Sequence, residues 1–176
     1  MIITLGDARA IDDSITQEDL DAFEVAFRSL TNNSFQNKHI RFKDIEFVGE
    51  NLIAVKDPIV GIKTGDTIEV NYSHYNDGLH VVEEIAGKQI KVQGTPFFVA
   101  NTSSSMLTLV QYPADIARGI KKLIAYDKKM ASKIGIKSES ISRMSITYYD
   151  VNASENIDGY PASLLSFLTK YEKMRW

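Results

Sequence analysis

The stretch DTIEVNYSHYNDGLHVVEEI, residues 66–85, decides what kind of structure the middle of this chain can form. Apolar and polar residues alternate on both sides of the central SHYNDG, and a period of two is typical of β-strands with one buried face. Asn76, Asp77 and Gly78 tolerate the positive φ angles of a tight turn, so the two halves are expected to pair as a hairpin. The sequence therefore predicts antiparallel β-structure here.

Strand-like alternation extends to both sides of this hairpin, from about residue 42 to residue 93. In FKDIEFV, residues 42–48, polar and apolar residues alternate from Asp44 to Phe47, and GIKTGD and AGK supply further turns. Short strands repeated at a spacing of about ten residues are typical of a small closed or nearly closed barrel. We therefore expect a small antiparallel β-barrel over residues 39–105.

Helical periodicity flanks this β-rich segment. Thr16 and Asp19 form a capping-box-like pair at the start of a first helix. Two further helices are expected after Pro113 and from Pro161, because proline suits the first turn of a helix. The three apolar stripes are Leu20, Phe23, Phe27 and Leu30; Ile116, Ile120, Leu123, Ile124 and Ile134; and Leu164, Leu165, Phe167, Leu168 and Tyr171.

The N-terminal helix could not bury its stripe alone, so helices from both ends of the chain are expected to pack as one bundle. The expected fold class is therefore α+β, a small α-helical bundle with an inserted small antiparallel β-barrel. Residues 1–38 and 106–176 would form the helical domain, and residues 39–105 the inserted barrel. Two independent domains are the alternative arrangement.

The composition is that of a soluble globular protein: 44 % of the 176 residues are hydrophobic and 24 % are charged. No window reaches the roughly 18 apolar residues of a membrane span, and the first residues lack a basic and an apolar region. We expect no membrane partner and an intracellular site of synthesis. The chain has no cysteine, which excludes disulfides, thiolate nucleophiles and cysteine-ligated metals.

The net charge of −3 is unevenly distributed along the chain. Residues 1–111 hold 9 Lys and Arg against 16 Asp and Glu, a net of −7, whereas residues 112–176 hold 11 against 7, a net of +4. Opposite signs at the two ends would help a head-to-tail assembly to find its register. Ordinary solvated faces explain the same division equally simply.

No catalytic constellation is present in the sequence. Glu83 and Glu84 are adjacent, and neighbours in a strand point to opposite faces. VGIKTGD, residues 60–66, lacks the glycine pattern of a phosphate-binding loop. The histidines are scattered along the chain, without a carboxylate cluster nearby to complete a metal site: His39, His74 and His80. We expect no enzyme activity, no cofactor and no metal.

One face of the helix expected over residues 114–134 is basic, with Arg118, Lys121, Lys122, Lys128, Lys129 and Lys133. The net charge is negative and no aromatic residues interleave with the lysines, which argues against a sequence-specific nucleic-acid site. Two interpretations stay open. The face lines a passage for DNA, with Lys121 and Lys122 facing the channel, or it meets an acidic neighbour.

The last part of the chain resembles the head–tail connector proteins of long-tailed bacteriophages, also called head-completion or adaptor proteins. The resemblance rests on Tyr112-Pro113-Ala114 opening a helix, on GIKSESISR (135–143), on the alternating ITYYD (146–150) and on Gly159-Tyr160-Pro161 opening a final helix. The middle stretch looks like small barrels of virion proteins.

This resemblance implies a structural virion protein made in the host cytoplasm and located in the neck of the particle. Such adaptors form a homo-oligomeric ring, typically dodecameric, beneath the portal protein. The ring extends the DNA channel, through which viral DNA passes without sequence-specific contacts, and docks the next neck or tail protein. A stopper or tail-terminator of the same neck is one alternative. A small binding module, whose barrel holds a peptide, sugar or nucleic acid, is another.

Two segments are expected to make the contacts in such a ring. The alternating run of residues 137–150 can add a strand to a neighbouring subunit, or can fold back as an ordinary surface hairpin. The C-terminal KYEKMRW can dock through its aromatic and arginine residues, or can pack on its own last helix. The residues expected at a subunit or portal interface are Ser138, Ser140, Ser142, Arg143, Ile146, Tyr148, Tyr171, Arg175 and Trp176.

Overall fold

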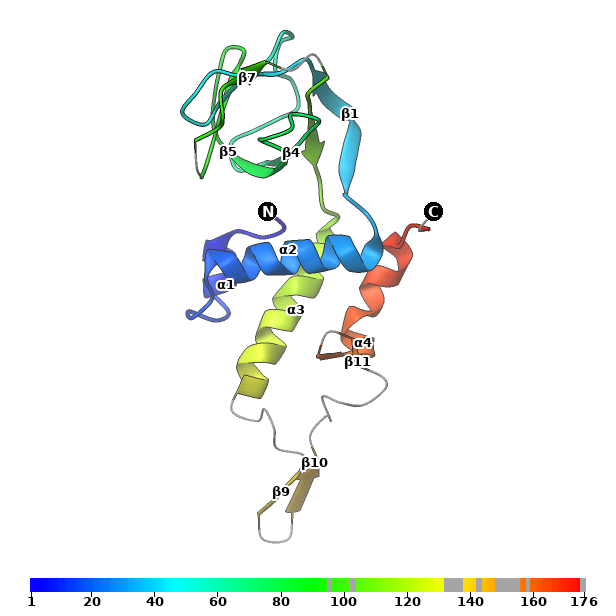
Figure 1. Ribbon diagram of the computed structural model, residues 1–176. Coiled ribbons are helices and arrows are strands. Elements are labelled where there is room, and N and C mark those ends of the chain that lie inside the picture. The colour runs from blue at the N-terminus through cyan, green and yellow to red at the C-terminus, as the bar shows by residue number, and fades with distance from the viewer. Residues whose placement is uncertain are drawn as a thin grey trace. The chain divides into compact units, whose positions relative to one another are not determined.

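The computed structural model describes residues 1–94, 96–101, 104–131, 138–141, 144–147, 156–157 and 159–174. Its contacts divide the chain into two compact units (Figure 1). The sheet unit consists of Ser34–Gln111 together with Met1. The helical unit consists of Ile2–Asn33 and Tyr112–Trp176, so it is built from both ends of the chain.

The sheet unit is an eight-stranded antiparallel sheet with the strand order β1-β8-β4-β5-β6-β3-β2-β7. Hairpins join β2 to β3, β4 to β5 and β5 to β6. The strands are β1 (Gln36–Lys43), β2 (Glu46–Phe47), β3 (Leu52–Ala54), β4 (Thr67–Asn71), β5 (Gly78–Ala86), β6 (Gln89–Val92), β7 (Ala100–Asn101) and β8 (Met106–Val110).

The expected fold class, a helical bundle carrying a closed small β-barrel, is wrong. The protein is a mixed α/β fold dominated by an open antiparallel sheet with few helices, and in the described residues no pairing joins the edge strands β1 and β7. Alternation along a strand predicts which face is buried, but closure depends on pairing between strands that are distant in the sequence. No local period encodes that pairing.

The core of the sheet unit comes from the inward positions of the alternating strands. Ile68 and Val70 of β4 are buried together with Val82 of β5 and Ile90 of β6. Phe47 packs edge-on against Phe97, with ring centroids 5.0 Å apart. The period of two therefore predicts the more buried positions of β6, and of β4 from Ile68 onward, whereas β8 buries four residues in succession, Leu107 to Val110.

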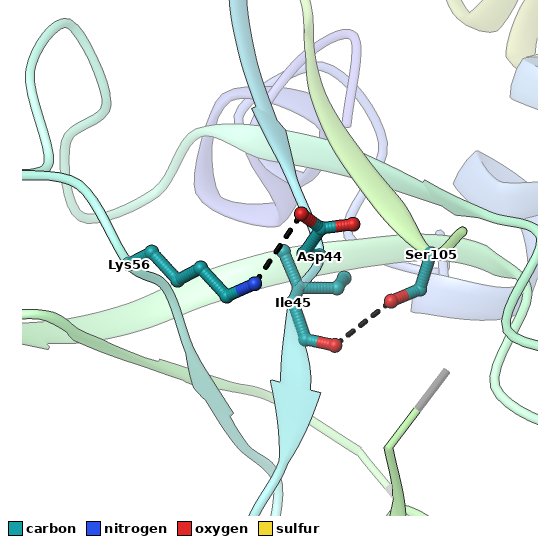
Figure 2. Close-up of polar contacts among 4 residues, drawn as sticks. All are labelled: Asp44, Ile45, Lys56 and Ser105. Atoms are coloured by element: carbon teal, nitrogen blue, oxygen red, sulfur yellow. Dashed lines mark hydrogen bonds and ion pairs between the residues drawn. The ribbon is translucent and has the colours of Figure 1, made fainter. Parts of the chain in front are cut away.

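The chain bends sharply between β1 and β2, and side chains hold the bend (Figure 2). Asp44 has a φ of +52°, and its N–H donates to the carbonyl oxygen of Ser105 at 2.8 Å. The buried Ser105 hydroxyl donates in turn to the carbonyl oxygen of Ile45 at 2.8 Å, and Lys56 pairs with the Asp44 carboxylate at 3.3 Å. These bonds satisfy backbone groups that lose their ladder partners at the bend.

The helical unit contains α1 (Leu5–Arg9), α2 (Gln17–Thr31), α3 (Ala114–Met130), α4 (Ala162–Leu165) and the 3₁₀-helix η2 (Ser166–Tyr171). It also contains two small hairpins, β9 (Ser138–Ile141) with β10 (Met144–Thr147), and β11 (Asn156–Ile157) with β12 (Tyr160–Pro161). The expected capping box is confirmed, since Thr16 N–H donates to Asp19 Oδ2 at 2.8 Å and Asp19 N–H to Thr16 Oγ1 at 3.3 Å.

Close packing of η2 on α3 depends on a glycine. A Cβ atom built at Gly119 would lie 2.1 Å from Cζ of Phe167, so only glycine leaves room for that ring. Phe167 also meets Phe27 of α2 edge-on, with centroids 6.0 Å apart. The aromatic ring thus links α2, α3 and η2.

The segment after η2 is attached to the C-terminal end of α2. The N–H of Lys173 donates to the carbonyl oxygen of Thr31 at 2.8 Å. Asn32 Nδ2 donates to the carbonyl oxygen of Met174, and Asn33 Nδ2 to that of Tyr171, each at 3.0 Å. The last carbonyl groups of a helix have no partner within it, and the Lys173 N–H supplies one to Thr31. The two asparagine side chains attach the segment that follows η2.

Replacing Gly119 by alanine is expected to destabilise the helical unit by about 1–3 kcal/mol, because the new methyl group overlaps the Phe167 ring. The better helix propensity of alanine offsets about 1 kcal/mol of that loss. Urea denaturation followed by far-ultraviolet circular dichroism measures the difference. In a Phe167→Leu background the same change should cost less, and an equal cost in both backgrounds would contradict the packing argument.

Candidate functional site

The loop between β4 and β5 is longer than the expected tight turn and has a different geometry. It spans residues 72–77, and positive φ angles occur at Tyr72 (64°) and His74 (70°) instead of at Asn76 and Asp77. A left-handed conformation costs roughly 1–2 kcal/mol at a residue with a side chain. Such strain is found where the surroundings enforce it, often at binding sites.

Asp77 enforces this conformation through its carboxylate. Oδ1 accepts the Ser73 N–H at 2.6 Å and the Ser73 hydroxyl at 2.5 Å, and Oδ2 accepts the Tyr72 N–H at 3.2 Å. Desolvation acts to raise the pKa of Asp77, but these hydrogen bonds outweigh it and lower the pKa below its ordinary value. The charged carboxylate therefore organises the first half of the loop.

Asn76 fastens the loop to the segment between β6 and β7. Its side chain is buried, Nδ2 donates to the carbonyl oxygen of Phe98 at 2.8 Å, and Oδ1 accepts the Phe98 N–H at 2.9 Å. The amide thus pairs with both backbone groups of one residue, as a neighbouring strand would. This pairing positions residues 97–99.

His80 supports the same loop from β5. Its ring meets Phe97 edge-on at 4.9 Å between centroids, and Nε2 lies 3.2 Å from the carbonyl oxygen of Asn76. Burial lowers the pKa of His80, and the bond to Asn76 opposes that effect only in part. The neutral ring then donates its Nε2 proton. Within the described residues no three His, Asp or Glu side chains are placed to hold a metal ion.

These bonds display exposed apolar side chains, of which we call Tyr75, Phe98 and Val99 the aromatic platform. Their exposed fractions are 76 %, 68 % and 77 %, and the ring centroids of Tyr75 and Phe98 lie 5.9 Å apart. Exposed apolar surface held on a rigid backbone usually marks an interaction site. The platform is therefore the strongest candidate site in the sheet unit.

The charges around the platform restrict its partners. Residues 71–77 and 96–101 carry the platform, and residues 46–51 lie beside it, because β2 pairs with β7 and Gly49 lies close to Val99. These three segments contain Glu46, Glu50 and Asp77 but no lysine or arginine. Such a surface repels phosphate groups and favours neutral or cationic partners. Sequence reasoning missed the platform, although the consecutive apolar residues 97–99, just beyond the alternating segment, break the period of two.

The predicted interface residues fall in three places. Ser142, Arg143, Tyr148, Arg175 and Trp176 lie outside the described residues. Ser138 and Ser140 lie in β9 and Ile146 in β10, with Ser138 opposite Thr147, Ser140 opposite Ser145 and Ile146 opposite Glu139. The alternating segment therefore forms a hairpin with itself.

The register gives this hairpin two unlike faces. Residues directly opposite each other share a face, and the face changes at every step along a strand. The pairs Ser138 with Thr147 and Ser140 with Ser145 fall on one face. The pairs Glu139 with Ile146 and Ile141 with Met144 fall on the other.

Tyr171 is held inside the helical unit. Its hydroxyl donates to Asp115 Oδ1 at 2.6 Å, which joins η2 to the first turn of α3. Lys170 pairs with the same carboxylate, and these two partners lower the pKa of Asp115. These contacts give Tyr171 a structural role in its own unit.

The basic face of α3 divides into paired and unpaired cations. Lys121 pairs with Asp7 at 3.1 Å, and Lys128 donates to the carbonyl oxygen of Ile11 at 2.7 Å. Arg118, Lys122 and Lys129 are exposed and have no partner among the described residues, and Lys133 lies outside those residues. The two cations expected in a DNA channel, Lys121 and Lys122, are therefore not equivalent.

The charge division along the sequence does not separate the two units. Residues 2–33 carry 2 cations against 7 acids, a net of −5, and they share the helical unit with residues 112–176, whose net is +4. The helical unit thus has a net of −1, and residues 34–111 have 7 cations against 9 acids, a net of −2. Most of the opposite charge is compensated within one unit.

Comparisons with known proteins do not identify a family. The chain matches no protein-family model, and no curated protein matches its sequence. In the part of the chain that the structure describes, no helix has the length and apolar character needed to span a membrane.

Asn76→Ala is expected to destabilise the sheet unit by about 1–3 kcal/mol, because it leaves the N–H and carbonyl groups of Phe98 without their partners. Hydrogen exchange at the Phe98 amide should accelerate as well. Tyr75→Ala is the matched control, since this exposed side chain shares the loop and its loss should change stability by less than about 0.5 kcal/mol. If the Phe98 amide exchanged as slowly in Asn76→Ala as in the wild type, the two hydrogen bonds between Asn76 and Phe98 would not be what holds residues 97–99.

The lowered pKa of His80 predicts a pH-dependent stability. Between the folded pKa and the unfolded value of about 6.5, the unfolded state binds more protons, so stability rises with pH in that window. The contribution is complete above about pH 6.5 and is lost as the pH falls toward the folded pKa. Urea denaturation at a series of pH values should show a steeper acid loss in the wild type than in His80→Gln. If stability fell equally with acid in both proteins, His80 would not be the source of the pH dependence.

Proposed function

We propose that this protein is a structural, non-enzymatic adaptor that joins a ring of its own copies beneath a phage portal. In this role it extends the DNA channel, offers a docking face for the next neck or tail protein, and resides in the neck of the virion after synthesis in the host cytoplasm. The sequence resemblance of residues 112–176 motivates the proposal.

The β9–β10 hairpin is the observation that carries it. In the described residues this hairpin is a complete sheet of two strands, and the positions of Ile141, Met144 and Ile146 share one face. An isolated two-stranded hairpin is marginal in water and becomes stable when a third strand or an apolar surface covers it. A neighbouring subunit supplies such a cover in a ring.

The C-terminal segment supports the same role. Residues 171–174 are bonded to the end of α2, so Arg175 and Trp176 follow a fixed stretch of chain. A tail that starts from a fixed point loses less conformational entropy when it docks. Arginine and tryptophan are both common among residues that dominate binding energy.

A small binding module is the second candidate, favoured by the aromatic platform of the sheet unit. The two candidates differ in behaviour. A binding module is a stable monomer that takes up a ligand on the platform, whereas an adaptor associates with portal rings and with its own copies.

Deleting residues 138–147 is expected to leave the helical unit folded, because α2, α3 and η2 pack without them. The same deletion should abolish incorporation into portal rings, because the strand or face that the neighbour covers is gone. Electron microscopy and sedimentation of the protein mixed with portal rings measure incorporation, and circular dichroism verifies folding. Val60→Ala, at an exposed site in the sheet unit, is the control. Incorporation of the deletion variant at the wild-type level would refute this role for the hairpin.

A further inference from the structure

The cations of α3 that have no partner among the residues the structure describes form a continuous stripe. Arg118, Lys122 and Lys129 are separated by four and seven residues, which places them on one side of the helix with the exposed Ala125 between them. The other cations of α3 that point to partners, Lys121 and Lys128, lie to one side of this stripe. We call Arg118, Lys122, Ala125 and Lys129 the cationic stripe.

The aromatic platform has the complementary chemistry. Its two rings are exposed, the segments that carry and flank it contain acids and no lysine or arginine, and Glu50 is exposed without a partner among the described residues. Lysine and arginine bind to the faces of tyrosine and phenylalanine rings as well as to carboxylates. The small Ala125 would let the cations on either side approach the rings closely.

We propose that the aromatic platform of one copy binds the cationic stripe of α3 in the next copy. The proposal rests on the proposed function and specifies which surfaces meet between neighbours in the ring. The two surfaces differ and belong to different units of the chain, so the contact is head-to-tail, and repeated contacts of this kind close into a ring when the rotation allows.

Duplex DNA is the competing partner for the stripe, and the charges favour a second copy. In the part of the helical unit that the structure describes, the stripe offers three cations without a partner, and the unit has a net charge of −1, which is little for binding to phosphates. DNA also leaves the exposed rings of Tyr75 and Phe98 without a partner. Contact with a neighbouring copy covers both surfaces at once.

Thiol cross-linking tests the contact directly, because the chain has no cysteine of its own. One preparation carries Ala125→Cys and the other Val99→Cys, which leaves both rings of the platform in place, and the two are mixed at concentrations on the order of 1 mM, where weak contacts are populated. Disulfide-linked heterodimer should form at least about tenfold faster than with Val60→Cys, an exposed site on another loop of the sheet unit. Since each protein has a single thiol, the product reports a contact between copies.

A charge exchange tests the chemistry of the contact. Lys122→Glu with Lys129→Glu should reduce heterodimer formation by about tenfold, because acids would face the acidic platform. Adding Glu50→Lys to the platform protein should restore much of the loss. Phe98→Ala should also reduce cross-linking, whereas Val25→Ala, at an exposed apolar site on α2, should not.

The outcomes separate this inference from the proposed function. If copies enter portal rings but the Ala125→Cys protein links to Val99→Cys no faster than to Val60→Cys, the inference is wrong and the ring role stands. If the wild type neither associates with itself nor joins portal rings, both are wrong. If a short DNA duplex protects the thiol of the Ala125→Cys protein from alkylation and no platform cross-link forms, the stripe is a DNA surface and the inference is again wrong.

Discussion

The antiparallel pairing of β1 with β8 is the constraint on which the rest of the structure depends. Gln36 lies opposite Val110, and the N–H of Gln111 donates to the carbonyl oxygen of Phe35 at 2.9 Å. This ladder brings together the two points at which the chain enters and leaves the sheet unit. The segments before and after it can then assemble α2, α3 and η2 into one unit, without the full entropic cost of closing so long a loop for every contact.

Where the strand ladders of the sheet end, polar side chains form the hydrogen bonds that a neighbouring strand would otherwise provide. The Ser105 hydroxyl donates to the carbonyl oxygen of Ile45 at the bend between β1 and β2. The Asn76 side-chain amide bonds to both the carbonyl oxygen and the N–H of Phe98. Bonds of this kind hold irregular chain rigidly without burying side chains around it. That is why the aromatic rings beside Asn76 stay exposed on a fixed backbone. The same rigidity lowers the entropy lost when a partner binds.

The candidate surfaces are what remains after the internal contacts of each unit are made. Lys121 pairs with the Asp7 carboxylate and Lys128 donates to the carbonyl oxygen of Ile11, so only part of the basic face of α3 is available to a partner. The Tyr171 hydroxyl likewise donates to the Asp115 carboxylate within the same unit. A count of charges or aromatic residues along the chain overestimates the surface available for binding, because it cannot distinguish a paired group from an unpaired one.

The sequence by itself determined the local features: the capping box of Thr16 with Asp19, the buried stripe of Ile116, Ile120, Leu123 and Ile124, and the inward positions of the strands. These depend on neighbours a few residues away, which periodicity records. Only the tertiary structure decided that the sheet is open, that the 72–77 loop is strained and clamped to Phe98, and which cations stay unpaired. Each of these depends on contacts between residues far apart in the chain, and such contacts leave no period in the sequence for a reader to detect.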